Sequence, residues 1–290
     1  MHGHAARVPR PAPASHNVGP VTTGPESKED RDKRHHQRTL FDGIAERYED
    51  SRPSYPSRAI EFVTTTAALA PGATILEIGC GTGQLTEQLA CHGFRLTAID
   101  IGPSMVATAQ RRLPDAEVSF QVTSFEDLVA ADRSFDLVIS SAAFHWIDPE
   151  IAFTKSARLL RPGGWLALLG TEERYDHPVG TTLDDLWIRH GDTGGAWDRR
   201  PSDPQAIAAT GLFTTPVCLT DEHQATLAPG EVIGLESTRA TFLSWPQSTQ
   251  RRFTEELRRA LEPHPTVHLT RQTSVTMAQV PGARSQRACY

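Results

Sequence analysis

The sequence has few cysteines, no long apolar run and no excess of basic residues. Its four cysteines among 290 residues form no C-x-x-C pair, so we expect neither a disulfide framework nor a metal site, and a cytoplasmic setting. No apolar stretch reaches the roughly 18 residues of a membrane span, and residues 1–10 lack the apolar segment of a secretory signal. The 29 Lys and Arg are outnumbered by 35 Asp and Glu, which argues against a nucleic-acid partner, because phosphate binding needs a concentrated basic face.

Large apolar side chains are almost missing from the start of the chain. Residues 1–38 are rich in Pro, His, Gly and charge. Such a segment cannot bury enough surface to offset the entropy lost on ordering. We therefore expect a disordered tail over residues 1–38 and one folded domain over residues 39–290.

The chain does contain a glycine-rich turn after a short apolar run. Residues 75–83 read I-L-E-I-G-C-G-T-G. The run predicts a buried strand, and the glycines predict a sharp turn into a helix, with backbone that a ligand can approach. This pattern indicates a nucleotide-type cofactor. A dinucleotide fingerprint would need a glycine at position 84 or 86, where the chain has Gln84 and Thr86, so NAD is disfavoured.

Strands and helices alternate after this turn. Apolar runs at residues 94–100, 118–122, 135–140 and 165–169 are separated by segments of helical periodicity. This alternation predicts an α/β fold with a Rossmann-like parallel sheet. The first of these runs ends in Asp100, at the carboxyl end of the neighbouring strand. There a carboxylate can accept hydrogen bonds from both hydroxyls of a ribose.

Three motifs resemble those of class I S-adenosylmethionine (SAM) methyltransferases. Glu77, Gly79, Gly81 and Gly83 match the E-x-G-x-G-x-G of their first motif. Residues 41–56, F-D-G-I-A-E-R-Y-E-D-S-R-P-S-Y-P, and the A-F-H-W that ends at Trp146 resemble the type 11 branch, which acts on small molecules. The resemblance implies a seven-stranded, mostly parallel sheet with an antiparallel last strand and helices on both faces. We expect a small helical lid, made from the N-terminal segment and the insertion at residues 171–210.

The resemblance also implies a set of cofactor-binding residues. Arg52 is expected to bind the methionine carboxylate, and Met105 to pack on the adenine. Many members of the wider superfamily carry an aspartate at Ser124 to receive the adenine amino group; here the backbone of Phe125 or the carboxylate of Glu126 has to do so. The expected cofactor-binding residues are Tyr48, Arg52, Glu77, Gly79, Gly81, Gly83, Asp100, Ile101, Met105, Ser124, Phe125, Glu126 and Ser141.

Aromatic residues are the candidates for the acceptor side. The N-P-P-Y sequence of enzymes that methylate base or amide nitrogens is absent after residue 140. We expect Tyr55, Phe144, Trp146 and Trp187 to contact the acceptor. His145 and Tyr175 are candidate general bases, because a neutral imidazole near the reacting atom could take the released proton. A packed, hydrogen-bonded His145 and an ordinary packed insertion are the alternatives.

Together these observations predict methyl transfer from SAM to a small acceptor, an aromatic or indole-like intermediate of secondary metabolism. The chain looks like actinobacterial natural-product methyltransferases, and indole C3-methylation is a chemistry of that group that would fit. Two alternatives stay open, a non-catalytic SAM-binding regulatory module and an NAD-dependent oxidoreductase. A homodimer stays open as well.

Overall fold

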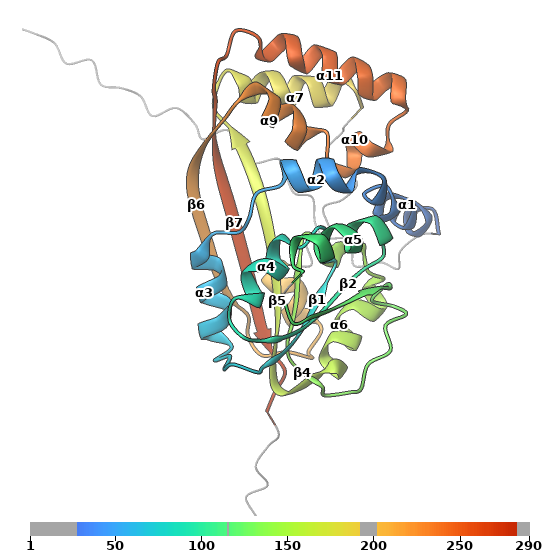
Figure 1. Cartoon of the computed structure of the whole chain (residues 1–290), viewed down its shortest axis with the longest axis vertical. Helices are drawn as coiled ribbons and strands as arrows, with labels where there is room; N and C mark the ends of the chain where they lie inside the picture. Colours follow the sequence, from blue (N-terminus) through green and yellow to red (C-terminus); the bar gives the residue numbers. More distant parts are fainter. Residues whose placement is uncertain (1–27, 115, 192–201, 283–290) are drawn as a thin grey trace, which may run out of the picture.

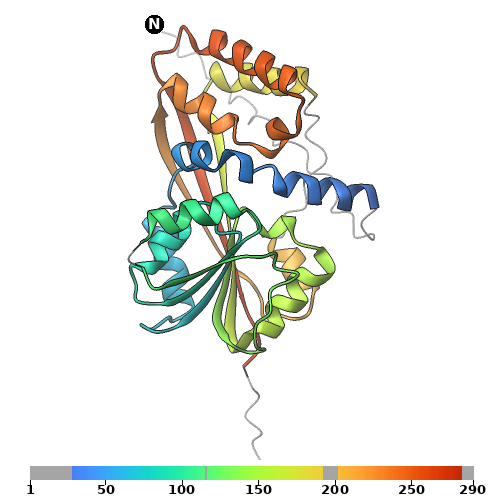
Figure 2. The same cartoon turned by 45° about the vertical axis from the view of Figure 1, so that its right-hand side comes forward.

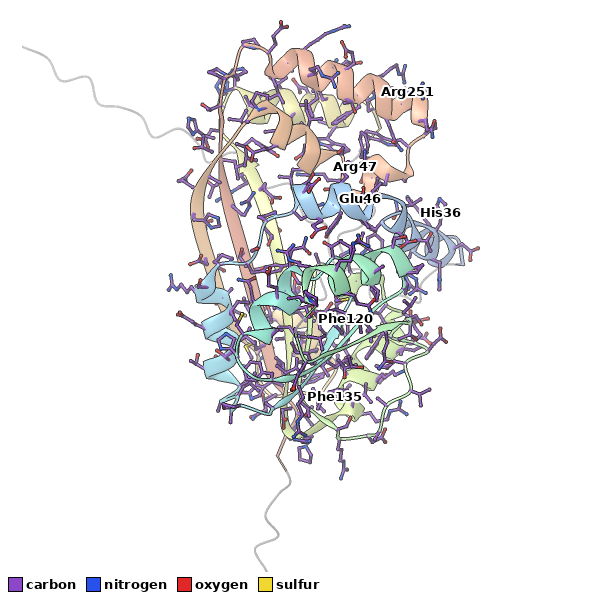
Figure 3. All side chains as sticks on the ribbon, viewed as in Figure 1. His36, Glu46, Arg47, Phe120, Phe135 and Arg251 are labelled. Carbon is purple, nitrogen blue, oxygen red and sulfur yellow. The ribbon has the colours of Figure 1, made fainter. Side chains whose placement is uncertain are left out.

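The computed structural model of the chain describes residues 28–114, 116–191 and 202–282. They form a sheet domain and a helical cap, joined by long strands and by the N-terminal helices (Figure 1). None of the helices in these ranges is long and apolar enough to cross a membrane. Figure 3 adds side chains to the ribbon; Phe120 and Phe135 mark the sheet domain, and Glu46 and Arg47 mark the helix below the cap.

The sheet has seven strands in the order β3-β2-β1-β4-β5-β7-β6. Strands β1 to β5 pair in parallel, and β7 runs antiparallel to both β5 and β6. The predicted fold class is therefore confirmed. The strands are β1 (Thr74–Ile78), β2 (Arg95–Asp100), β3 (Val118–Val122), β4 (Phe135–Ser141), β5 (Leu160–Tyr175), β6 (Val217–Leu227) and β7 (Val267–Gln279).

Helices cover both faces of the sheet. Buried residues of α3 (Ser57–Thr66) and α4 (Gln84–Ala90) share one apolar cluster with β1 and β7. Residues of α6 (Pro149–Leu159) and α8 (Pro204–Ala209) belong to the cluster on the other face. Helix α5 (Pro103–Arg112) packs against β2 and β3. Because β1 and β4 are covered on both sides, their sequences are nearly continuous apolar runs.

The cap differs from the predicted lid. Residues 171–175 are not lid but the end of β5, paired with residues 269–273 of β7. The cap consists of α7 (Val179–Arg189), α9 (Pro229–Glu236), α10 (Ala240–Ser244) and α11 (Gln247–Leu261), which share an apolar cluster of their own. The prediction of a lid at residues 171–210 is right for α7, which lies in the cap, and wrong for residues 171–175 and for α8, which packs on the sheet. The rest of the cap comes from helices far along the chain, α9 to α11. Residues 192–201 lie outside the described ranges.

An N-terminal helix lies between the cap and the sheet domain (Figure 2). It is α1 (Lys28–Thr39), followed by η1 (Asp42–Ile44) and α2 (Ala45–Ser51). The predicted tail boundary at residue 38 is therefore wrong. Composition misled because α1 buries polar side chains: Arg34 and Gln37 are each only 2% exposed. The rest of the predicted tail, residues 1–27, lies outside the described part of the chain.

Candidate active site

The glycine-rich turn leaves β1 and enters α4 at the carboxyl edge of the sheet. The N–H groups of Gly79 and Cys80 both donate to the Ile99 carbonyl, at 2.8 and 3.0 Å, which joins the turn to β2. Gly79 has φ +70°, and a Cβ there would overlap the Cβ of Ala143, in the loop after β4. Only glycine fits this position, because both the backbone conformation and the close approach exclude a side chain.

Asp100 closes β2 and faces the same turn. One carboxylate oxygen accepts from the Gly81 N–H at 3.0 Å and the other from the Gly102 N–H at 2.9 Å. Burial raises the pKa of Asp100, and these hydrogen bonds oppose that shift. A carboxylate has about four acceptor positions, so both oxygens can still receive donors from a ligand.

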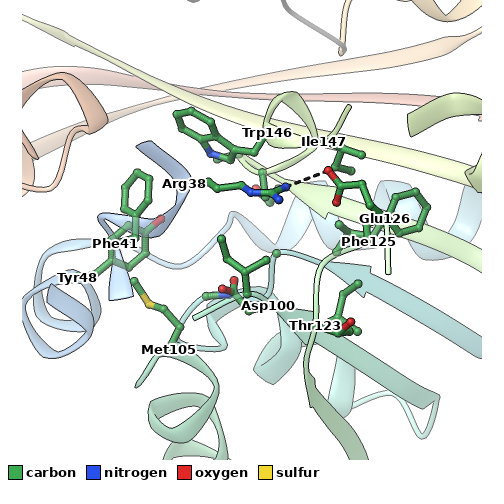
Figure 4. A pocket seen from close by; sticks show the side chains of 18 residues that line it. Arg38, Phe41, Tyr48, Asp100, Met105, Thr123, Phe125, Glu126, Trp146 and Ile147 are labelled. Carbon is green, nitrogen blue, oxygen red and sulfur yellow. Dashed lines mark hydrogen bonds and ion pairs between the residues drawn. The ribbon is translucent and has the colours of Figure 1, made fainter. Parts of the chain in front are cut away.

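A cavity lies over the ends of β1, β2 and β4, between them and α1 (Figure 4). Its empty volume, counted with the solvent at its mouth, is about 700 Å³. The predicted residues that line it are Tyr48, Gly79, Gly81, Asp100, Ile101, Met105, Phe125, Glu126, Ser141 and Trp146. The remaining lining residues were not predicted: Arg38, Phe41, Ile78, Ile99, Thr123, Ala142, Ala143 and Ile147.

The segment before α2 is fixed on the cavity by Asp42. Its carboxylate accepts from the backbone N–H groups of Ser104, at 2.7 Å, and Met105, at 3.3 Å. These are donors of the first turn of α5, which have no partner within their own helix. The contact holds Phe41 over the cavity, 5.9 Å from the ring of Tyr48 and 6.0 Å from that of Trp146. One wall of the cavity is therefore aromatic.

Glu126 is the acid on the opposite side. Its Oε1 accepts from Arg38 Nη1 at 2.9 Å and from the Asp148 N–H at 3.3 Å. Its Oε2 is buried and has no hydrogen-bond partner in the described part of the chain. The loop itself is fixed by Lys155, whose ammonium donates to the carbonyls of Glu126 and Leu128 at 3.0 and 2.8 Å. Arg38 was missed because it fell in the predicted tail; the lack of proline and glycine between residues 28 and 39 was the available signal.

Four predicted cofactor residues lie outside the lining, and three of them hold neighbouring loops in place. Glu77 is 2% exposed and accepts from the Thr86 hydroxyl at 2.7 Å, and burial raises its pKa to about 8. Gly83 precedes α4 and packs on Ala109. The Ser124 hydroxyl donates to Asp127 at 2.7 Å, within its own turn. Glu77 and Gly83 therefore shape the glycine-rich turn, and Ser124 shapes the loop that carries Glu126.

Arg52 and Tyr55 lie behind Tyr48 rather than on the cavity wall. Arg52 Nη2 donates to the Thr238 carbonyl at 3.2 Å, and its guanidinium lies 5.3 Å from the centre of the Tyr48 ring. Its Nε is buried without a hydrogen-bond partner among the described residues. The backbone of Tyr55 exchanges two hydrogen bonds with the amide of Gln88, and burial raises the pKa of its hydroxyl.

Two of the predicted acceptor contacts are core residues instead. Phe144 is 4% exposed and packs on Phe153, with ring centres 5.2 Å apart. Trp187 is 7% exposed and packs within the cap against Phe253, at 4.6 Å. Neither side chain lines the cavity. These two predictions are wrong because residue type and position along the chain do not reveal which face a side chain takes.

The predicted base Tyr175 belongs to a buried network of the cap. Glu236 is fully buried and accepts from the Tyr175 hydroxyl at 2.8 Å and from the Trp187 indole N–H at 2.9 Å. Arg239 pairs with the same carboxylate at 2.8 Å. Burial, and next the charge of Glu236, raise the pKa of Tyr175. Its hydroxyl is thus a donor at neutral pH and not a proton acceptor, which corrects the prediction.

The second predicted base, His145, stands beside the cavity. Its ring lies 4.5 Å from that of Trp146, and it is not among the lining residues. Burial lowers its pKa to about 4. The imidazole is therefore neutral at pH 7 but accepts a proton weakly, whereas a general base works best with a pKa near the operating pH. Elsewhere in the described ranges, no group of three His, Cys, Asp or Glu side chains is arranged to hold a metal ion.

The glycine-rich turn, Asp100 and the cavity at the ends of the parallel strands define a Rossmann-like nucleotide-cofactor enzyme. Residues 76–168 match the family model described as methyltransferase domain. An uncharacterised methyltransferase of Mycobacterium bovis is 32% identical over 223 residues, which are 75% of this chain and 84% of the relative. A ubiquinone biosynthesis O-methyltransferase of Xanthomonas euvesicatoria is 38% identical over 145 residues, 46% of this chain and 60% of its own length.

Solved structures share the fold. A structure described as a type II methyltransferase of Anaeromyxobacter dehalogenans has a TM-score of 0.59 and 22% identity, covering 80% of this chain and 99% of that one. The YcgJ protein of Bacillus subtilis has a TM-score of 0.52 and 17% identity, covering 79% of this chain and all of its own. The chain belongs to the methyltransferase family. It is a SAM-dependent methyltransferase, and its cofactor is SAM.

Proposed function

We propose that the cavity binds SAM and that a small, flat acceptor enters against its aromatic wall. Two acids that line the cavity have free acceptor positions that fit this cofactor. Asp100 keeps acceptor capacity for two ribose hydroxyls, and Glu126 Oε2 is a buried acceptor for the adenine amino group. Arg52 lies behind Tyr48 and outside the cavity lining, so its contact with the methionine carboxylate stays a prediction.

The single observation that carries the proposal is that one cavity is lined by Asp100 and by Glu126, whose Oε2 has no hydrogen-bond partner among the described residues. Ile101, Met105 and Phe125 add apolar surface to the same cavity, as an adenine ring requires. Gly79 and Gly81 line the cavity with bare backbone, which the methionine portion can approach closely. Glu77, tied to Thr86, keeps that turn in place.

The chain itself has mainly to align its two substrates. Bound SAM supplies an activated methyl group on a sulfonium. Phe41, Tyr48 and Trp146 would hold the ring of the acceptor and exclude water beside that group. Alignment of this kind can lower a barrier by roughly 7 to 11 kcal/mol, more than a general base contributes. No dedicated base is therefore required, and a proton-accepting role of His145 stays a prediction.

For the acceptor we propose an aromatic metabolite, with indoles of secondary metabolism as the first group to test. The aromatic wall of the cavity, formed by Phe41, Tyr48 and Trp146, supports this proposal. The aromatic residues of the predicted lid do not. Phenols belong in the same panel, because one relative is named an O-methyltransferase of ubiquinone biosynthesis.

Calorimetric titration with SAM and with S-adenosylhomocysteine (SAH) tests the cofactor site. The wild-type chain should bind both, and Asp100→Asn should weaken both by at least tenfold, because it removes a charged acceptor. Failure of the wild type to bind would refute the proposed site. Incubation with SAM and a panel of indoles, phenols and matched aliphatic alcohols and amines, read as the mass gain of one methyl, tests the acceptor. Turnover of the aliphatic members alone would refute the aromatic class.

A further inference from the structure

We propose that Arg38 is a positioning residue that makes the site selective for adenine, by holding Glu126 with its free oxygen toward the cavity. The inference rests on the proposed function, in which Glu126 Oε2 receives the adenine amino group. It adds a residue of α1 to the site and couples the place of that helix to recognition of the base.

The ion pair between Arg38 and Glu126 holds the Glu126 carboxylate in one position. The two side chains are 13% and 17% exposed, and the pair joins Arg38 Nη1 to Glu126 Oε1 at 2.9 Å (Figure 4). The Asp148 N–H donates to the same oxygen. Both of these contacts fall on Oε1, and Oε2 stays buried, without a hydrogen-bond partner in the described part of the chain. Both residues line the cavity.

Arg38 is itself held in place from two sides. Its Nη2 shares a hydrogen bond of 3.0 Å with His35 Nδ1, so both ends of the guanidinium fork are engaged. One turn earlier, Arg34 Nη1 donates to the Trp146 carbonyl at 2.8 Å. Residues four apart lie on the same face of a helix. One face of α1 therefore contacts the loop after β3 through Arg38 and the loop after β4 through Arg34.

Removal of Arg38 would leave a largely buried carboxylate without its cation. Because an unpaired buried charge is costly, the side chain of Glu126 would rotate toward water. Oε2 would then leave the cavity wall. Affinity would be lost for a purine base that donates a hydrogen bond to this oxygen. Adenine has an exocyclic amino group there, whereas hypoxanthine has a carbonyl oxygen, which a carboxylate repels.

The comparison of SAH with S-inosylhomocysteine isolates this contact, because the two ligands differ only in that amino group and its ring tautomer. We would titrate both into the full-length chain and compare the two dissociation constants. The wild type should prefer SAH by about a hundredfold, as a charge-assisted hydrogen bond replaced by a repulsion implies. Arg38→Gln should reduce the preference to below about tenfold. Arg38→Lys keeps the charge and should stay within about threefold of the wild type.

Two further variants make the result specific. Glu126→Gln exchanges an acceptor for an amide that can also donate, so its preference should fall to near one. Arg47→Gln is the matched control, since it removes the same charge from an exposed residue of α2, labelled in Figure 3. It should retain the wild-type preference. Circular dichroism would verify that each variant is folded.

The ratio distinguishes positioning from a merely structural role. If Arg38 only stabilises α1, Arg38→Gln weakens both ligands equally and keeps the wild-type ratio, which overturns the proposal. An unchanged ratio in Glu126→Gln overturns it as well. If the wild type binds neither ligand, the proposed function fails and this inference falls with it. If the wild type binds SAH tightly but does not discriminate, only this inference fails.

Discussion

Glu77 should make the stability of the protein fall as the pH rises above neutrality. Its carboxyl group is 2% exposed under the glycine-rich turn, with the Thr86 hydroxyl at 2.7 Å. Burial is the main cause that raises its pKa from 4.5 to about 8. Between these values the folded state keeps a proton that the unfolded state has lost. Stability is therefore greatest at low pH and is lost progressively up to the folded-state pKa.

The magnitude follows from the width of that window. Each pH unit in which only the folded state is protonated costs about 1.4 kcal/mol. From pH 6.5 to 8.5 the contribution of Glu77 falls by about 2 kcal/mol, because the effect levels off above pH 8. His145 contributes little between pH 6.5 and 8.5. Its pKa is lowered from 6.5 to about 4, so above pH 6.5 its imidazole is mostly neutral in the folded and in the unfolded protein. Below that pH, His145 acts in the opposite direction.

Urea unfolding of the wild type and Glu77→Gln, at half-unit steps from pH 6.5 to 8.5 without cofactor, measures this contribution. The amide keeps the size of the side chain and an acceptor for Thr86 but has no proton to lose. The difference in unfolding free energy between the two proteins should therefore shift by about 2 kcal/mol across the series, in favour of the variant. A difference that changes by less than about 0.5 kcal/mol would refute the reasoning.

Three other substitutions have outcomes that the structure defines. Gly79→Ala should lower stability by about 3 kcal/mol in urea unfolding, through overlap and a positive φ, whereas Gly43→Ala, with nothing within 4 Å of its new Cβ, should cost under about 1 kcal/mol. Tyr175→Phe should leave turnover within about threefold but lower stability by about 1 to 3 kcal/mol, because a buried carboxylate loses a donor. His145→Gln should change the turnover rate at pH 7 less than about threefold, and a loss of about a hundredfold would instead establish His145 as the base.

The features of the site that could be predicted from the sequence are those set by neighbouring residues or by adjacent strands. Glycines at every second position after an apolar run predict a turn that other residues cannot adopt, and Gly79 and Gly81 do take positive φ there. Asp100 follows from chain direction, because parallel neighbours end at the same edge of the sheet. These constraints act within a few residues or between adjacent strands. Periodicity and motif spacing therefore carry them.

The acceptor side could not be predicted in this way. Tyr175 and Trp187 were expected over the cavity because they are aromatic residues in a long insertion. Both turn toward Glu236, a residue of another segment that no spacing rule connects to them. The length of β5 was also decisive, since pairing with β7 continues to Tyr175 and carries that residue into the cap. Long-range pairing of this kind is invisible in a single sequence.

The loop after β3 and helix α1 depend on each other through an acid of that loop. Ser124 does not supply an acid, and its hydroxyl donates to Asp127 within the turn. The acid that does line the cavity, Glu126, comes two residues later on a longer side chain with more rotatable bonds. A longer side chain loses more entropy when it is fixed, and a buried carboxylate needs a compensating charge. Arg38 supplies both the charge and the fixed position, so the altered loop and the N-terminal helix form one arrangement that neither could provide alone.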